Sequence, residues 1–355
     1  MISQNALHHA EKCRFCWMCR HLCPVQHQTG KEINTPRAKG LMLSMVNKGE
    51  QSFDKDMAQA MYECLLCDAC TNDCATGYQP PLFIREARTE AVVNELAPEA
   101  VMTLIDNVLS TGNLYGVEKP SFGQDGTDVL VYIGEVAAVK VPEMAKNLLA
   151  VLKKAGVSAK VLDKEPASGV MLGDLMGYTE EVRQQAVACA EAINAAGLPV
   201  VVLDSYDAEI MKQKYPEWGC EIRTDVVTAT AYVAGLLEQG KLEAKAARGV
   251  KGACHDDDRL ARTFHEFAPI RAMAKAAGYE ACEMFNHEKL ARSCGTAVAC
   301  GYMPQIVEKI AASRWEDLKR VDGAAMLVAN PQAYLCLSGK IPEGCALVDL
   351  FGALV

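Results

Sequence analysis

Eight of the sixteen cysteines stand in two tightly spaced runs near the N-terminus, and this spacing restricts the fold more than any other feature. The first run, CRFCWMCRHLCP, begins at Cys13 and has the pattern Cys-x-x-Cys-x-x-Cys-x-x-x-Cys-Pro. The second run, CLLCDACTNDCA, begins at Cys64 and repeats the pattern with Ala75 in place of the proline. Two-residue loops let consecutive thiolates converge on corners of one cube while backbone N–H groups point at the sulfurs. The spacing therefore predicts two [4Fe-4S] clusters.

The two runs resemble those of bacterial two-cluster ferredoxins, in which three cysteines of a run hold one cluster and the fourth holds the other. The resemblance implies that the first cluster is held by Cys13, Cys16, Cys19 and Cys74. It implies that the second cluster is held by Cys64, Cys67, Cys70 and Cys23.

A structural zinc site is the alternative for these thiols, because Cys-x-x-Cys pairs also form zinc knuckles. Zinc takes four ligands, usually from two separated pairs. Each run here instead has three closely spaced cysteines and a distant fourth. The sequence therefore favours iron–sulfur clusters over zinc.

Five other residues near the runs could either act on a cluster or serve only the structure. We expect Phe15 and Trp17 to be packing residues rather than modulators of a cluster. Arg37 either donates to the cluster or backbone, or is solvated at the start of a helix, and the sequence leaves both open. His8 and His9 are predicted to be surface residues, not ligands.

The composition is that of a folded protein. The chain has 355 residues, half of them apolar, which is enough to bury a core and to divide into two or three domains. Its net charge of −9 argues against nucleic acid as a partner and against direct anchoring on an anionic membrane. No secretory segment opens the sequence, and the apolar stretch 129–139 is shorter than the roughly 20 residues of a membrane span. We expect a cytoplasmic protein that reaches a membrane only through a partner.

The apolar pattern predicts an α+β protein with three domains. Residues 1–120 read as an α-helical, ferredoxin-like dicluster domain, with a helix starting at Pro36. Over 121–245, short apolar runs alternate with amphipathic helices, which is typical of an α/β lobe with a short parallel sheet. The same order recurs over 246–355, so we predict that the two lobes arose by internal duplication.

The cysteine runs, the TPRAKG segment at 35–40 and a duplicated region with Asp256, Arg259-Leu260-Ala261-Arg262 and Ser293-Cys294-Gly295 together resemble a known family. They are similar to the iron–sulfur subunits of glycolate oxidase, anaerobic glycerol-3-phosphate dehydrogenase and heterodisulfide reductase. The resemblance covers nearly the whole chain. It implies that each C-terminal lobe is a degenerate CCG domain, a cysteine-rich unit that here has lost most of its cysteines.

A third cluster in the second lobe is the less favoured alternative. Four thiols lie near the family's cluster loops, namely Cys254, Cys294, Cys300 and Cys336. Only Cys294 stands at a family ligand position, while Asp258 occupies a former one. Free cysteines are also common in α/β cores. We therefore expect two clusters and a second lobe that serves as scaffold.

Together these features predict a non-catalytic electron-transfer subunit. It would carry electrons between a flavin-containing dehydrogenase or oxidase subunit and a quinone, a ferredoxin or an electron-transferring flavoprotein. No G-x-G-x-x-G follows a predicted strand, so flavin and nicotinamide are expected on another chain. We expect no catalytic residue in this one.

A heterodisulfide-reductase-like catalytic subunit is the alternative function. Its C-terminal lobes would act on a disulfide or another small molecule, with Cys294, Cys254 and His255 as candidate groups. Against it, adjacent residues at a strand end point to opposite faces. An iron–sulfur redox sensor is less supported, because no DNA-binding motif accompanies the clusters.

Overall fold

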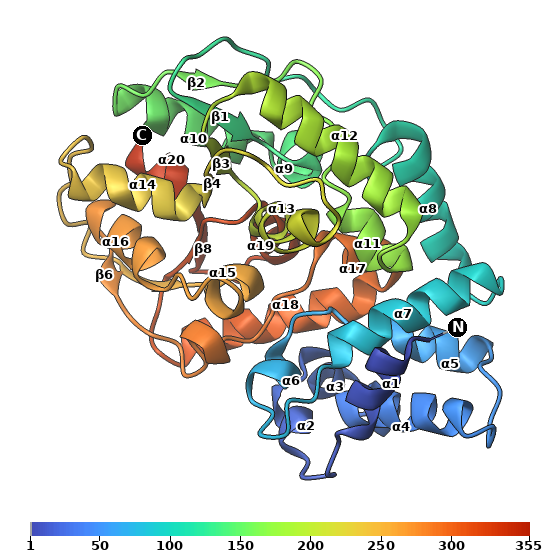
Figure 1. Ribbon diagram of the computed structural model, residues 1–355. Helices are drawn as coiled ribbons and strands as arrows, with labels where there is room; N and C mark the ends of the chain where they lie inside the picture. Colours follow the sequence, from blue (N-terminus) through green and yellow to red (C-terminus); the bar gives the residue numbers. More distant parts are fainter. Residues whose placement is uncertain (1) are drawn as a thin grey trace.

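A computed structural model describes residues 2–355 and contains helices and two four-stranded sheets (Figure 1). Every pairing between neighbouring strands in the two sheets is parallel. The N-terminal helices form a group at one end of the molecule, and the sheets with their helices make up the rest (Figure 1). The predicted mixed α+β class with short parallel sheets is thereby confirmed.

The N-terminal part consists of helices and connecting loops, and each cysteine run extends from a loop through a short helix. Thr35 begins the helix that contains the TPRAKG segment, because its side chain accepts a hydrogen bond from the Ala38 N–H and Pro36 follows at the first helical position. The predicted helix start at Pro36 is therefore confirmed. The elements are α1 (Gln4–Glu11), α2 (Met18–Leu22), α3 (Pro24–Thr29), the 3₁₀ helix η1 (Glu32–Asn34), α4 (Pro36–Asn47), α5 (Lys55–Tyr62), α6 (Ala69–Asn72), α7 (Pro80–Val93) and α8 (Glu99–Thr111).

The first sheet has the strand order β2-β1-β3-β4. All four residues of β1 and all three of β3 are buried, as expected of apolar strands covered by helices on both faces. The elements of this first lobe are β1 (Val129–Tyr132), α9 (Glu135–Lys140), α10 (Pro142–Lys154), β2 (Ala159–Lys160), α11 (Val170–Met176), α12 (Glu180–Ala196), β3 (Val200–Val202), α13 (Ser205–Glu217), β4 (Val226–Thr228) and α14 (Ala229–Glu238).

The second sheet has the order β6-β5-β7-β8, which repeats the order of the first. The recurrence of strands and helices seen in the sequence is thus a recurrence of topology. The elements of this second lobe are β5 (Lys251–Cys254), α15 (Asp258–Arg262), α16 (Ala268–Ala276), β6 (Glu280–Ala281), the 3₁₀ helix η2 (Glu288–Leu290), α17 (Ala297–Tyr302), α18 (Pro304–Lys319), β7 (Ala325–Val328), α19 (Pro331–Ser338), β8 (Ala346–Asp349) and α20 (Leu350–Leu354).

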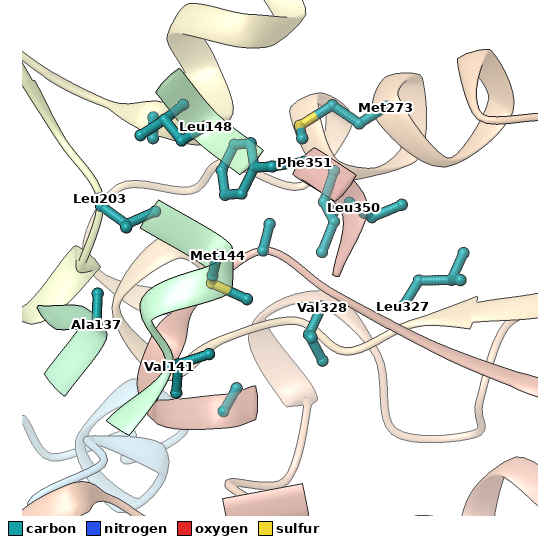
Figure 2. Close-up of a cluster of buried hydrophobic side chains, with 14 of the residues drawn as sticks. Ala137, Val141, Met144, Leu148, Leu203, Met273, Leu327, Val328, Leu350 and Phe351 are labelled. Atoms are coloured by element: carbon teal, nitrogen blue, oxygen red, sulfur yellow. The ribbon is translucent and has the colours of Figure 1, made fainter. Parts of the chain in front are cut away.

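The two lobes share a hydrophobic core. Helix α20 packs on α10 of the first lobe, and α16 packs on α14. Figure 2 shows Met144 and Leu148 from α10 beside Phe351 from α20 and Met273 from α16, and all four side chains are at most 1% exposed. The chain therefore joins the lobes by burying apolar surface between them.

The carboxyl ends of the strands meet at a buried polar interface. Asn330, after β7, donates from Nδ2 to Oδ1 of Asp204, after β3, at 3.1 Å. Ser205 donates from Oγ to Asp257, after β5, at 2.5 Å. Burial raises the pKa of Asp204, and it raises the pKa of both Asp257 and Glu135 to about 7. Asp257 and Glu135 at this interface are therefore mostly protonated below about pH 7.

Glu135→Gln should make the free energy of unfolding less dependent on pH. An unfolded glutamate has a pKa near 4.3, so the contribution of the buried neutral acid is complete below that value and is lost as pH rises through about 7. Urea unfolding of the whole chain, followed by tryptophan fluorescence at pH 5.5 and 8.0, measures the difference. We expect the fall in stability to shrink by about 2 kcal/mol in the variant. The exposed Glu143→Gln serves as control, and identical pH profiles for both variants would refute the assignment.

Candidate metal centre

The two cysteine runs line two neighbouring cavities in the helical N-terminal part. The first cavity has a volume of about 130 Å³, and its wall includes Cys13, Cys16, Cys19 and Cys74. The second has a volume of about 20 Å³, and its wall includes Cys23, Cys64, Cys67 and Cys70. Cys70 also reaches the wall of the first cavity. Each cavity thus combines the first three cysteines of one run with the last cysteine of the other.

The first two cysteines of both runs stand on loops of the same shape, and the third stands in the short helix that follows, α2 or α6. Phe15 and Trp17 have φ values of 53° and 69°, and Leu66 and Asp68, at the matching positions, have values of 54° and 59°. Positive φ is uncommon outside glycine and turns the backbone sharply. As a result, the N–H of Phe15 donates to Cys13 Sγ, and the N–H of Leu66 donates to Cys64 Sγ, each at 3.4 Å. Amide groups directed at thiolate sulfurs are typical of iron–sulfur loops.

Several of these thiols are held away from water. Burial raises the pKa of Cys19 to about 11 and raises the pKa of Cys23 and Cys70. Burial acts in the same direction on Cys74, but hydrogen bonds from Thr76 outweigh it and lower the pKa of that thiol. Metal binding requires thiolates and releases their protons. Since soft thiolates select iron–sulfur clusters or zinc, the donor set fits an iron–sulfur group.

Comparisons with known proteins decide between these metals. The family model of the 4Fe-4S dicluster domain matches residues 9–78. The chain is 24% identical to the EtfAB:quinone oxidoreductase of Syntrophomonas wolfei, over 91% of this chain and 52% of that protein. It is 31% identical to a subunit of the anaerobic glycerol-3-phosphate dehydrogenase of Escherichia coli K12, over 28% of this chain and 27% of that protein. These findings support the resemblance of the chain to iron–sulfur subunits of oxidoreductases, and they place a 4Fe-4S dicluster domain at residues 9–78.

Two further comparisons concern length and fold. The chain is 22% identical to a probable membrane-anchored ferredoxin of Chromohalobacter salexigens, over 82% of this chain and 47% of that protein. The chain thus spans about half or less of the length of these curated relatives. A crystal structure of a hypothetical protein from Helicobacter pylori has the same fold, with a TM-score of 0.58 at 11% identity, over 99% of this chain and 72% of that one. Across residues 2–355, no helix combines the length and apolar character needed to cross a membrane.

The two loops of the dicluster domain lie in different surroundings. Cys16, in the first run, is exposed, whereas Cys67, at the matching position of the second, is 8% exposed. Arginines from elsewhere bind the backbone of the second run. Arg259 donates to the Leu66 carbonyl at 3.0 Å, and Arg262 donates to the Cys67 carbonyl at 2.8 Å. The second run is therefore held against the second lobe.

These arginine contacts were not predicted from the sequence. The pair Arg259 and Arg262 stood out only through the family resemblance, which assigned it no partner. Arg88, on α7, also binds the second run by donating to the Cys64 carbonyl at 2.7 Å. The only sequence signal for these roles is a set of arginines on apolar helices, and their carbonyl partners lie many residues away.

The aromatic residues of the first loop differ from the prediction. Phe15 is 49% exposed and Trp17 is 43% exposed, so the expectation that they are packing residues was wrong. The Arg37 side chain pairs with Glu32 at 2.6 Å and stacks on Trp17, 3.4 Å from the ring centroid. Its backbone, not its guanidinium, hydrogen-bonds Cys19.

The histidines before the first run lie as expected. His8 is exposed, and the ring of the half-buried His9 lies 3.2 Å from the Gly77 carbonyl. Neither ring lines a cysteine cavity.

The structure brings together three of the four thiols considered for a third cluster. Cys300 Sγ and Cys336 Sγ are 3.6 Å apart, and Cys294 interacts with Cys336. Cys254 instead contacts the Ile270 carbonyl at 3.8 Å. Within residues 2–355, no three or more His, Cys, Asp or Glu side chains are arranged as ligands of a single metal ion.

His255 is the remaining candidate of the catalytic alternative. Its ring is 3% exposed, and burial holds its pKa well below the usual value, with Arg314 and Arg262 acting in the same direction. The charged neighbours of Cys254 are instead Arg271 and Asp256. Cys254 and His255 therefore lie in different surroundings, as expected at the end of a strand.

Lys39 is a further residue that the sequence did not reveal. It belongs to the TPRAKG segment, lines the second cavity and is 1% exposed. Its Nζ donates to the Ile33 carbonyl at 3.3 Å. Burial lowers its pKa, while the nearby thiols of Cys64 and Cys23 raise it. A buried cation beside these sulfurs favours negative charge at the second cavity.

Lys39→Met should therefore lower the reduction potential of a cluster held at the second cavity. Loss of a positive charge in a poorly solvated site destabilises the added electron, by roughly 50 mV or more. An anaerobic redox titration followed by EPR measures the change, and the exposed Lys48→Met is the matched control. Equal potentials in the two variants would show that Lys39 does not act on this site.

Proposed function

We propose that the chain carries electrons through two [4Fe-4S] clusters between a flavin-containing dehydrogenase or oxidase subunit and a further acceptor. The acceptor would be a quinone, a ferredoxin or an electron-transferring flavoprotein. The supporting observation is the pair of cavities, each lined by three cysteines of one run and the last cysteine of the other. The relatives include a probable membrane-anchored ferredoxin and a quinone oxidoreductase, which supports the same class of function.

In this proposal, Cys13, Cys16, Cys19 and Cys74 hold one cluster, and Cys64, Cys67, Cys70 and Cys23 hold the other. A bound cluster supplies transfer of one electron at a time. The residues of the chain position the sulfurs, exclude water and direct backbone N–H groups at them. Such hydrogen bonds, together with burial, set the potential of an iron–sulfur site.

The domain roles follow from this arrangement. Residues 1–120 would form the helical, ferredoxin-like dicluster domain, with lobes 121–245 and 246–355 as its scaffold. The shared core between the lobes and the arginines that bind the second run support that role. The proposed location is cytoplasmic, with any membrane association through a partner subunit.

A heterodisulfide-reductase-like catalytic subunit remains the second candidate function. The observation in its favour is the group of three thiols formed by Cys294, Cys300 and Cys336 in the second lobe. Thiols in contact can undergo exchange with a disulfide when one of them ionises. Hydrogen bonding to Cys336 lowers the pKa of Cys300, whereas the pKa of Cys336 is raised, so Cys300 is better suited for attack than Cys336.

Anaerobically purified chain should contain about eight iron atoms, four for each of two clusters. Cys19→Ser or Cys67→Ser should remove about half of the iron and destabilise the dicluster domain, because a small domain depends on its metal sites. Iron and labile-sulfide analysis with EPR of the reduced chain measures this, and Cys220→Ser is the control. Stoichiometric zinc without sulfide would overturn the proposal. Twelve iron atoms, falling to eight in Cys294→Ala, would instead establish a third cluster.

The isolated chain should bind no flavin and show no dehydrogenase activity with 2-hydroxy acids or polyols. Addition of the flavoprotein that co-purifies from native extract should produce substrate-dependent dye reduction, and Cys19→Ser should abolish the part that passes through this chain. Flavin bound to the isolated chain, or activity without the flavoprotein, would favour the catalytic alternative.

A further inference from the structure

An exposed apolar patch lies beside the first cysteine cavity. It consists of Phe15, Trp17, Met18 and Leu41, with Arg37 among them, and we name it the cluster-edge patch. The four apolar side chains are between 43% and 55% exposed. Trp17, Met18 and Arg37 also line the cavity that contains Cys13, Cys16 and Cys19. The patch therefore lies between solvent and the wall of this cavity.

The patch is held in place by its own contacts. The Arg37 guanidinium lies 3.4 Å from the centroid of the Trp17 ring and 5.8 Å from that of Phe15. Leu41 follows Arg37 by one turn of α4 and so shares its face of the helix. Adjacent large apolar side chains at a soluble surface mark interaction sites more often than isolated ones do. Aromatic and arginine residues are enriched at the centres of protein interfaces.

The charged side chains that contact the aromatic rings of the patch are arginines, Arg20 and Arg37. Residues 1–48 contain seven Lys or Arg and two Asp or Glu, which gives a net charge of +5. The remaining 307 residues contain 29 basic and 43 acidic residues, a net charge of −14. Arg14 and Arg20 are exposed in the same run of sequence, and Arg20 lies 5.6 Å from the Trp17 ring. The arginines beside the aromatic rings therefore favour an acidic partner at the patch.

The matching loop of the second run has no such exposed patch. The residue equivalent to Phe15 is Leu66, which is 1% exposed, and the residue equivalent to Trp17 is Asp68, which pairs with Arg259 at 3.2 Å. Loops of the same shape thus carry apolar exposed residues in one run and buried or paired residues in the other. The difference indicates that the first loop, and not the second, meets another protein.

We propose that the cluster-edge patch is the docking surface for an acidic flavoprotein, which exchanges electrons with the first cluster. This inference rests on the proposed electron-transfer function and adds the face and the charge of the partner. In each encounter one electron passes between the partner's flavin and the cluster, so one is oxidised as the other is reduced. No bond forms or breaks.

The test measures the rate at which reduced flavodoxin, an acidic flavoprotein, reduces the oxidised chain in anaerobic stopped flow. Two variants alter the patch without changing residues that line the cavity. The double variant Phe15→Asn/Leu41→Gln removes apolar surface, and asparagine is chosen at position 15 because it tolerates positive φ. The single variant Arg20→Glu reverses a charge beside the patch. The matched controls are Phe285→Asn, at a residue that is 89% exposed, and the exposed Lys153→Glu.

Reduced riboflavin, which is small and uncharged, measures cluster competence in every protein. We expect both patch variants to react with flavodoxin roughly tenfold more slowly, with a rate that falls as salt rises, while riboflavin rates and control variants stay within about twofold of wild type. Flavodoxin rates equal to those of the controls would overturn the docking surface while leaving electron transfer intact. Burial of the patch in a dimer of this chain, or binding of the patch to anionic vesicles, would also overturn the proposed docking surface. Failure of riboflavin to reduce the wild type would overturn the proposed function itself.

Discussion

The arrangement of thiols around two shared cavities is the constraint on which the rest of the structure depends. Each cavity takes its fourth cysteine from the other run, so the helices around residues 13–23 and 64–74 must lie side by side. Several of these thiols are poorly solvated, and burial raises the pKa of Cys19, Cys23 and Cys70. A metal group that accepts thiolates compensates this cost, which couples binding to the folding of the small helical domain.

Burial then distinguishes the two cavities. Arg259 and Arg262, at the carboxyl end of the second sheet, bind carbonyls of the second run and cover its loop. In the first run, by contrast, Phe15 and Trp17 are exposed. One side of the dicluster domain thus packs against the lobes, and the other side faces solvent. An electron carrier needs one accessible end, and this asymmetry provides it.

The two lobes repeat one topology and meet at a polar edge. Their strand orders are the same, and their carboxyl edges meet at hydrogen-bonded acids such as Asp204 and Asp257. In the second lobe, Asp258 occupies a position at which the family resemblance places a cysteine. It now pairs with Arg262 at 2.7 Å and accepts a hydrogen bond from Ser293 at the same distance. Asp258 therefore supports the arginine that binds the second cysteine run.

The sequence by itself determined the elements whose signals are local. Cysteine spacing predicted the iron–sulfur motif, Thr35 and Pro36 predicted the start of α4, and alternating apolar runs predicted two parallel sheets. Side-chain environments depend on contacts between distant residues, and only the tertiary structure decided these. It exposed Phe15 and Trp17, buried Lys39, and separated Cys254 from Cys294, Cys300 and Cys336. The physical reason is that spacing along a chain specifies backbone geometry over a few residues, whereas solvation and charge are set by whatever else packs nearby.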